Sequence, residues 1–185
     1  GSEVLMACTW NTDLINEVGK AMGREGVASG ADILLTTSLN IHRHPLNGRH
    51  FEYFSEDPVL MGEMASAQML GVQSQGVTVT LKHFALYNKR YPQAQNANVT
   101  ERAAREIYLK GFEIAVKDSV AEDNALAVMS SYGKINGTYA SEIKGLMTGI
   151  LRNEWGFDGL VMSDWGAAAD ATKSLLAGNN IKGPS

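Results

Sequence analysis

The chain has 185 residues, of which 44% are hydrophobic and 19% are charged, and its formal net charge is −4 at pH 7. These proportions are typical of a globular protein with a sizeable core, and a negative chain without a basic cluster does not indicate nucleic acid as the main partner. The single cysteine, Cys8, excludes an internal disulfide framework. No apolar run approaches the roughly 20 residues of a membrane span.

Strand-like and helix-like patterns alternate along the chain. The continuous apolar or β-type runs cover residues 3–8, 33–36, 77–81, 126–129 and 160–162. Helical spacing of apolar residues, preceded by cap or first-turn signals, predicts helices that begin near Asn11–Thr12, Pro58, Thr100, Ser141 and Ala167. Two loops, 38–57 and 84–99, exceed the usual connection of about two to six residues, which marks them as functional or mobile.

The pattern amounts to five strand–helix units, which predicts an α/β fold with parallel strands and helical crossovers. The strands lack polar alternation, as expected when both faces of a sheet are buried. Five units do not close an eight-stranded barrel, for which about 250 residues is typical. The chain is therefore either part of a (β/α) barrel or an open doubly wound sheet, and the alternation alone slightly favours the open sheet.

The first long loop, residues 40–58, combines Arg49 with histidines, carboxylates and aromatic side chains. Sugar-binding sites need this mixture, because planar polar groups bind hydroxyls and aromatic faces pack against the ring. A structural loop held by its own ion pairs explains the composition equally well. Its histidines at 42, 44 and 50 match no standard zinc spacing, so no metal is expected.

Polar side chains also follow the later strands. Lys82 and His83 come directly after the run 77–81, where they could bind hydroxyls or a developing negative charge. A neutral, buried His83 satisfied by the backbone is the structural alternative. Tyr132 follows the run 126–129 and could reach Asp164, which follows the last run beside Trp165. Carboxyl ends of parallel strands carry the chemistry of α/β barrels, although Asp164 could instead cap the next helix.

Five motifs in this order resemble glycoside hydrolase family 3, the β-glucosidase and β-xylosidase family. They are GRHFEYFSEDP (48–58), KHF (82–84), EIYL (106–109), VMSSY (128–132) and WGFDGLVMSDW (155–165). The resemblance covers about residues 10–178. It implies a TIM-type (β/α)8 barrel, so that residues 1–185 would be one incomplete barrel domain without the α/β sandwich domain that usually follows it.

The resemblance also implies a retaining, exo-acting hydrolysis of β-glycosides without a cofactor or metal. Asp164 matches the nucleophile that forms a covalent glycosyl-enzyme. Arg49, Lys82 and His83 match residues that bind sugar hydroxyls. Trp165 would line the same subsite, and Tyr132 would lie near the nucleophile.

Retaining hydrolysis needs a second carboxyl about 5–5.5 Å from the nucleophile, and the resemblance does not place that acid/base group in this chain. In most of the family it comes from the sandwich domain. Another branch uses a histidine in a Lys-His-Phe-Pro-Gly-His loop, but here KHF is followed by Ala85-Leu86-Tyr87.

Two other interpretations stay open from the sequence. The chain could be a catalytically silent fragment that binds sugar weakly or serves as a scaffold. Missing barrel strands would leave unpaired sheet edges, from which we expect a homo-oligomer or pairing with a complementing barrel or sandwich segment. An open-sheet protein of unrelated function is the remaining alternative.

Overall fold

The computed structural model describes residues 2–88, 95–124, 126–167 and 170–184 of the chain. Its main sheet contains β1 (Ile33–Leu34), β2 (Thr78–Phe84), β4 (Leu126–Ser130) and β7 (Leu160–Ser163), in that spatial order and with every pair parallel. A small second sheet is formed by β3 (Asn96–Ala97), β5 (Lys134–Ile135) and β6 (Thr138–Tyr139). The predicted α/β fold with parallel strands is thus confirmed.

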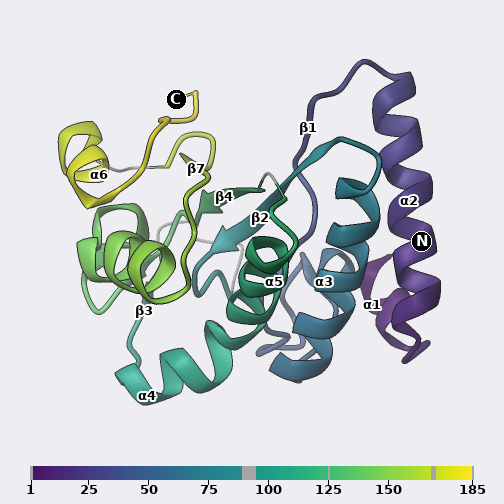
Figure 1. Cartoon of the computed structure of the whole chain (residues 1–185). Coiled ribbons are helices and arrows are strands. Elements are labelled where there is room, and N and C mark those ends of the chain that lie inside the picture. Colours follow the sequence, from purple (N-terminus) through teal and green to yellow (C-terminus); the bar gives the residue numbers. More distant parts are fainter. Residues whose placement is uncertain (1, 89–94, 125, 168–169, 185) are drawn as a thin grey trace.

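The strands of the main sheet lie in the order in which they occur along the chain (Figure 1). An open doubly wound sheet changes direction at a switch point, whereas a barrel adds each strand beside the preceding one. The described strands show no change of direction, so the open-sheet interpretation that the alternation slightly favoured receives no support. The described residues do not close a barrel. A parallel bridge from Met162 to Ile181 begins a further neighbour on the outer side of β7.

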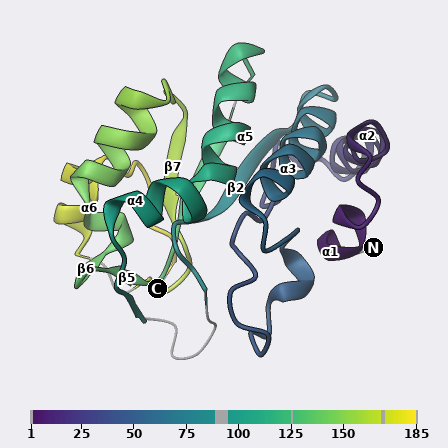
Figure 2. The ribbon, with the colours of Figure 1, turned by 90° about the horizontal axis from the view of Figure 1, so that it is seen from below.

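Helices precede, connect and follow the strands of the main sheet. They are α2 (Thr12–Ala28), α3 (Pro58–Gln73), α4 (Glu101–Ala103) continued by η2 (Ala104–Tyr108) and α5 (Lys110–Ala121), η4 (Gly145–Glu154) and α6 (Ala171–Ala177). Short 3-10 turns, η1 (His50–Glu52) and η3 (Ala140–Glu142), lie in the loops. Helices α2, α3 and α5 stand side by side on one face of the sheet (Figures 1 and 2). No helix in the described part of the chain is long and apolar enough to cross a membrane.

Several local signals act as predicted. The Asn11 side chain accepts a hydrogen bond from the Leu14 N–H and caps α2. Pro58 occupies the first turn of α3 behind the Asp57 cap. Thr100 caps α4 through the Ala103 N–H. The side-chain oxygens of Asn11, Asp57 and Thr100 accept hydrogen bonds from N–H groups that have no partner within the helix. Pro58 has no N–H, so it leaves no unpaired donor at the helix start.

Three expectations were wrong. The apolar stretch at the start folds as helix α1 (Glu3–Ala7), so the main sheet has four described strands rather than five. Helix η4 begins at Gly145, without a side-chain cap from Ser141, which lies in η3. The final helix begins at Ala171 with Asp170 as its cap. Asp164 therefore is not a helix cap, which removes the structural alternative for this carboxylate.

Helices α2 and α3 touch through glycines. A Cβ atom on Gly71 would lie 2.2 Å from the Asn16 carbonyl oxygen, and one on Gly19 would lie 2.2 Å from the Gln68 carbonyl oxygen. Both obstacles are backbone atoms, which cannot move aside without separating the helices. The close packing of α2 on α3 therefore requires the absence of side chains at these two positions.

We expect Gly71→Ala to lower the free energy of unfolding by about 1–3 kcal/mol, the usual cost of overpacking a filled core. Gly149→Ala is the matched control, because its Cβ would meet only the Lys144 carbonyl oxygen at 3.9 Å. The control should be neutral or stabilising by up to about 1 kcal/mol, since alanine favours the helix. Urea unfolding of the three proteins measures both effects, and equal values for the two variants would contradict the packing argument.

Candidate active site

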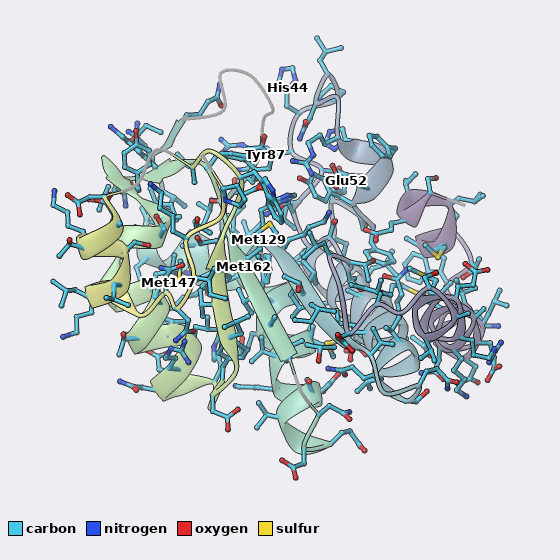
Figure 3. All side chains as sticks on the ribbon, turned by 90° about the horizontal axis from the view of Figure 1, so that it is seen from above. His44, Glu52, Tyr87, Met129, Met147 and Met162 are labelled. Carbon is cyan, nitrogen blue, oxygen red and sulfur yellow. The ribbon has the colours of Figure 1, made fainter. Side chains whose placement is uncertain are left out.

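All six predicted site residues line one cavity of about 280 Å³ at the carboxyl ends of the main strands. The structure brings together residues that lie as much as 116 positions apart, from Arg49 to Trp165. Leu35 and Met129 complete the lining, which consists of Leu35, Arg49, Lys82, His83, Met129, Tyr132, Asp164 and Trp165. Figure 3 shows Glu52 and Tyr87 on the same side of the molecule as the loop that carries His44.

The strand register explains why these side chains meet. Lys82 pairs with Met129, and Ser130 pairs with Ser163, so that β2, β4 and β7 end at the same level. Tyr132 and Asp164 follow their strands by one or two residues. The Asp164 N–H continues the ladder by donating to the Ser130 carbonyl oxygen at 3.1 Å, which fixes the backbone of the candidate nucleophile.

Asp164 is a buried carboxylate with specific donors. Its residue is 6% exposed, and its Oδ1 atom accepts the Trp165 N–H at 2.7 Å. The Tyr132 hydroxyl interacts with the same carboxylate and lowers its pKa. Burial raises the pKa of Asp164 above its ordinary value, although these donors and the charges of Arg49 and Lys82 oppose the rise. Burial and the neighbouring Asp164 carboxylate raise the pKa of Tyr132 to about 12.

His83 is a neutral, fixed group. It is 2% exposed, and its burial, with the charges of Arg49 and Lys82, holds its pKa well below the ordinary value. Its Nε2 atom lies 3.1 Å from Arg49 Nη2 and 3.4 Å from Asp164 Oδ2. Arginine can only donate, so the first contact requires the Nε2 lone pair and leaves the ring proton on Nδ1. Because His83 is neutral, its approach to Asp164 is not an ion pair.

The cationic side chains are held by Glu52, a residue that the sequence reasoning did not single out. Arg49 binds Glu52 through Nε to Oε1 and through Nη2 to Oε2 at 2.8 Å. Lys82 Nζ lies 3.7 Å from Glu52 Oε2. The interpretation of loop 40–58 as held by its own ion pairs is thus confirmed, and the same carboxylate orients two residues that line the cavity. The three-residue spacing between Arg49 and Glu52 is the sequence signal that could have identified Glu52 as a partner of Arg49.

Two further residues support the site. The Tyr87 ring lies 5.1 Å from the His83 ring and 5.7 Å from the Tyr132 ring, and the Arg49 guanidinium stands 5.3 Å from its centre. Asn40 binds the backbone of His83 in both directions, with a 3.0 Å hydrogen bond each way. Sequence reasoning treated Tyr87 only as a departure from a motif, because its ring contacts depend on the bend after β2.

The cavity mouth is partly apolar and its interior is charged. Trp165 is 43% exposed at the cavity, where its ring offers an apolar face beside the carboxylate. Of the described residues that line the cavity, Asp164 is the one that carries a carboxylate. Within the described ranges, no group of three or more His, Cys, Asp or Glu side chains is arranged to hold a metal ion. The arrangement suits a polyhydroxylated ring bound beside one nucleophilic carboxylate.

The neutrality of His83 predicts a pH dependence of stability. The unfolded chain takes up a proton on this histidine near pH 6.5, whereas the folded chain does so only at much lower pH. The free energy of unfolding should therefore fall by about 1.4 kcal/mol between about pH 7.5 and 5.5 from this group alone. Urea unfolding measures the free energy of unfolding at both pH values. The difference between the two values should be smaller in His83→Gln than in the wild type by about that amount. An unchanged difference would show that His83 takes up its proton equally in the folded and unfolded states, and would contradict the lowered pKa.

Comparisons with known proteins identify the family of this chain. Residues 2–180 match the model of the glycosyl hydrolase family 3 N-terminal domain. β-Glucosidase A of Butyrivibrio fibrisolvens is 49% identical over 179 residues, which are 96% of this chain and 21% of that protein. An exo-α-(1→6)-L-arabinopyranosidase of Bifidobacterium longum is 44% identical over 180 residues, or 97% of this chain and 23% of that protein.

Solved structures that resemble this chain also include β-glucosidases. β-Glucosidase 3B of Thermotoga neapolitana in complex with glucose is 52% identical, with a TM-score of 0.93, over 99% of this chain and 25% of that one. The chain thus spans about a fifth to a quarter of the length of these relatives. Because the model of the family's N-terminal domain covers nearly all of its residues, the chain belongs to glycosyl hydrolase family 3.

Proposed function

We propose that this chain carries the nucleophile and part of the sugar subsite of a retaining, exo-acting β-glycoside hydrolase, with β-glucosides as the substrate class. The observation that carries the proposal is the cavity itself, in which one buried carboxylate stands beside Arg49, Lys82 and a neutral histidine. Relatives named β-glucosidases, one of them solved with glucose, support the choice of sugar. The arabinopyranosidase relative shows that sugar preference varies among chains of this similarity.

In the proposed mechanism, an Asp164 oxygen attacks the anomeric carbon while the bond to the leaving-group oxygen breaks, and a covalent glycosyl ester forms. Tyr132 and the Trp165 N–H hold the carboxylate in position for this attack. Arg49, Lys82 and His83 bind hydroxyls of the ring. Glu52 keeps the two cations at fixed positions, so little reorganisation accompanies binding.

The proposal takes the general acid from outside this cavity, because its described lining holds one carboxylate. The relatives are four to five times as long as this chain and have ample sequence to supply it. Without the acid, a poor leaving group departs slowly, and the loss commonly amounts to about 10²–10⁴-fold in rate. An activated leaving group needs no protonation, so it isolates the role of Asp164.

We expect a 2-deoxy-2-fluoro-β-glucoside with a dinitrophenyl leaving group to label the chain once, on Asp164. Intact mass and peptide mapping identify the adduct. Asp164→Asn should not react, whereas Asp170→Asn should react normally, because Asp170 is an exposed helix cap outside the cavity. A folded chain that remains unlabelled, or an adduct at another residue, would refute the proposed nucleophile.

A scaffold or self-associating role is the second candidate, and the exposed edge of β1 favours it. Ile33 is 45% exposed and Leu35 is 41% exposed, and β1 pairs with β2 alone among the described strands. An unpaired apolar edge is a template for another strand, so a second copy or a complementing barrel segment fits it.

This candidate predicts that the 20.0 kDa chain runs as a dimer or larger species in size-exclusion chromatography with light scattering. Ile33→Lys should shift the population toward monomer, because a charge on an edge strand opposes pairing. Leu46→Lys is the control, since Leu46 is 86% exposed but lies in a loop away from β1. A monomer at all concentrations would count against edge pairing.

A further inference from the structure

Tyr87 is an aromatic residue that contacts the candidate site from outside the described cavity lining. Its side chain is buried, with 3% of the residue exposed. Its ring centre lies 5.1 Å from that of His83 and 5.7 Å from that of Tyr132, and the Arg49 Cζ atom stands 5.3 Å from the ring centre. Three of the six predicted site residues thus share one neighbour, to which the proposed mechanism gives no task.

The turn that carries Tyr87 is held from two sides. The Ser131 hydroxyl donates to the Ala85 carbonyl oxygen at 2.7 Å, and the Asn47 side chain donates to the Asn88 carbonyl oxygen at 3.1 Å. The first hydrogen bond ties the turn to the residue that follows β4, and the second ties it to the first long loop. The Tyr87 ring therefore stands on a fixed stretch of backbone.

The Arg49 guanidinium is held by three different groups. Nε and Nη2 bind Glu52, and Nη2 also lies 3.1 Å from His83 Nε2. A guanidinium carries five N–H donors, and the two on Nη1 are those that neither Glu52 nor His83 uses. The Tyr87 ring is the third support, because an arginine cation over an aromatic face within about 6 Å is attracted to it. Burial opposes the charge of Arg49, but contacts with Glu52 and Tyr87 help to raise its pKa above the ordinary value.

We propose that Tyr87 is a positioning residue whose ring holds the Arg49 guanidinium in the orientation in which Nη1 meets a sugar hydroxyl. The proposal rests on the proposed function, because it concerns sugar binding by Arg49. Tyr87 lies outside the described lining of the cavity, so it acts through Arg49 and not on the sugar itself. A planar guanidinium binds its partners in a limited range of directions, so a ring that fixes this plane helps to decide which sugars fit.

The first test measures the labelling of Asp164 by the fluoroglucoside. Tyr87→Leu removes the ring and should raise the inhibitor dissociation constant about tenfold, with the maximal labelling rate within about twofold of the wild type. Tyr87→Phe keeps the ring and should label within about twofold of the wild type. Tyr87→Met takes the place of Tyr87→Leu if the leucine variant does not fold. A loss in Tyr87→Phe as large as that in Tyr87→Leu would overturn the role of the ring.

Tyr108 provides the matched control. It is also a buried tyrosine with an arginine over its ring, since the Arg43 Cζ atom stands 5.9 Å from the ring centre, but it lies outside the cavity lining. Tyr108→Leu should therefore label normally. An equal rise of the dissociation constant in Tyr108→Leu and Tyr87→Leu would show a general loss of packing and would overturn the positioning role.

A double-mutant cycle shows whether the ring acts through Arg49. Arg49→Lys keeps a positive charge beside Glu52 but replaces the planar guanidinium by a point charge. In that background Tyr87→Leu should cause at most about a twofold further loss, because the plane that the ring fixes is already absent. Multiplicative losses would mean that Tyr87 acts through His83 or Tyr132, and they would contradict the proposal.

The position of Arg49 can also be measured without a sugar. Its Nε–H signal in a proton–nitrogen correlation NMR spectrum, identified by its loss in Arg49→Lys, is sensitive to the ring current of a nearby aromatic side chain. Tyr87→Leu should shift this signal and speed the exchange of its proton with water, whereas Tyr87→Phe should leave both close to the wild type. A signal that Tyr87→Leu does not change would overturn the positioning role. A wild-type chain that does not label would refute the proposed function, whereas the NMR measurement still decides the role of Tyr87.

Discussion

The candidate site depends on the parallel pairing of β2, β4 and β7, in which the β2–β4 register shifts between Lys82 and Phe84. This pairing brings three chain segments to one level, and the hydrogen bond from the Asp164 N–H to Ser130 carries it one residue past the end of β7. Residue faces alternate along a strand, so a slip of one residue would turn every side chain to the opposite face. The position of Lys82 relative to Asp164 is therefore a property of the sheet rather than of the loops.

Electrostatics then gives the assembled side chains different tasks. Glu52 neutralises part of the charge of Arg49 and Lys82, and the same two cations, with burial, keep His83 neutral. Asp164 is left as the carboxylate that faces the cavity without a direct cation contact. A carboxylate bound tightly by a cation would be less basic, so Glu52, which binds both cations from outside the cavity lining, helps to preserve the basicity of Asp164.

Much of this arrangement could be predicted from residues alone, and the failures have physical causes. Asn11, Pro58 and Thr100 act locally, through atoms within one helical turn, and were predicted correctly. Glu3–Ala7 was not, because an apolar run of this length fits a buried helix as well as a strand.

The site was predicted less evenly. Motif positions selected six residues that the structure brings to one cavity, and their roles stay predictions. Glu52, Asn40 and Tyr87 were not assigned roles, because their contacts cross between loops whose courses no local pattern encodes. Asp164 and Asp170 also show the limit of prediction from local sequence patterns. Both precede alanine-rich sequence, and only the folded chain reveals which carboxylate caps α6.

The agreement between strand order and chain order has a consequence for how such a protein can be divided. Each strand–helix unit rests on the unit made just before it, so the nearest-neighbour contacts of one unit are complete once the next has been synthesised. Folding can then proceed one unit at a time from the N-terminus. A cut between units would divide the candidate site, because Arg49, Lys82 and Asp164 belong to different units, so these units have to be inherited or exchanged together.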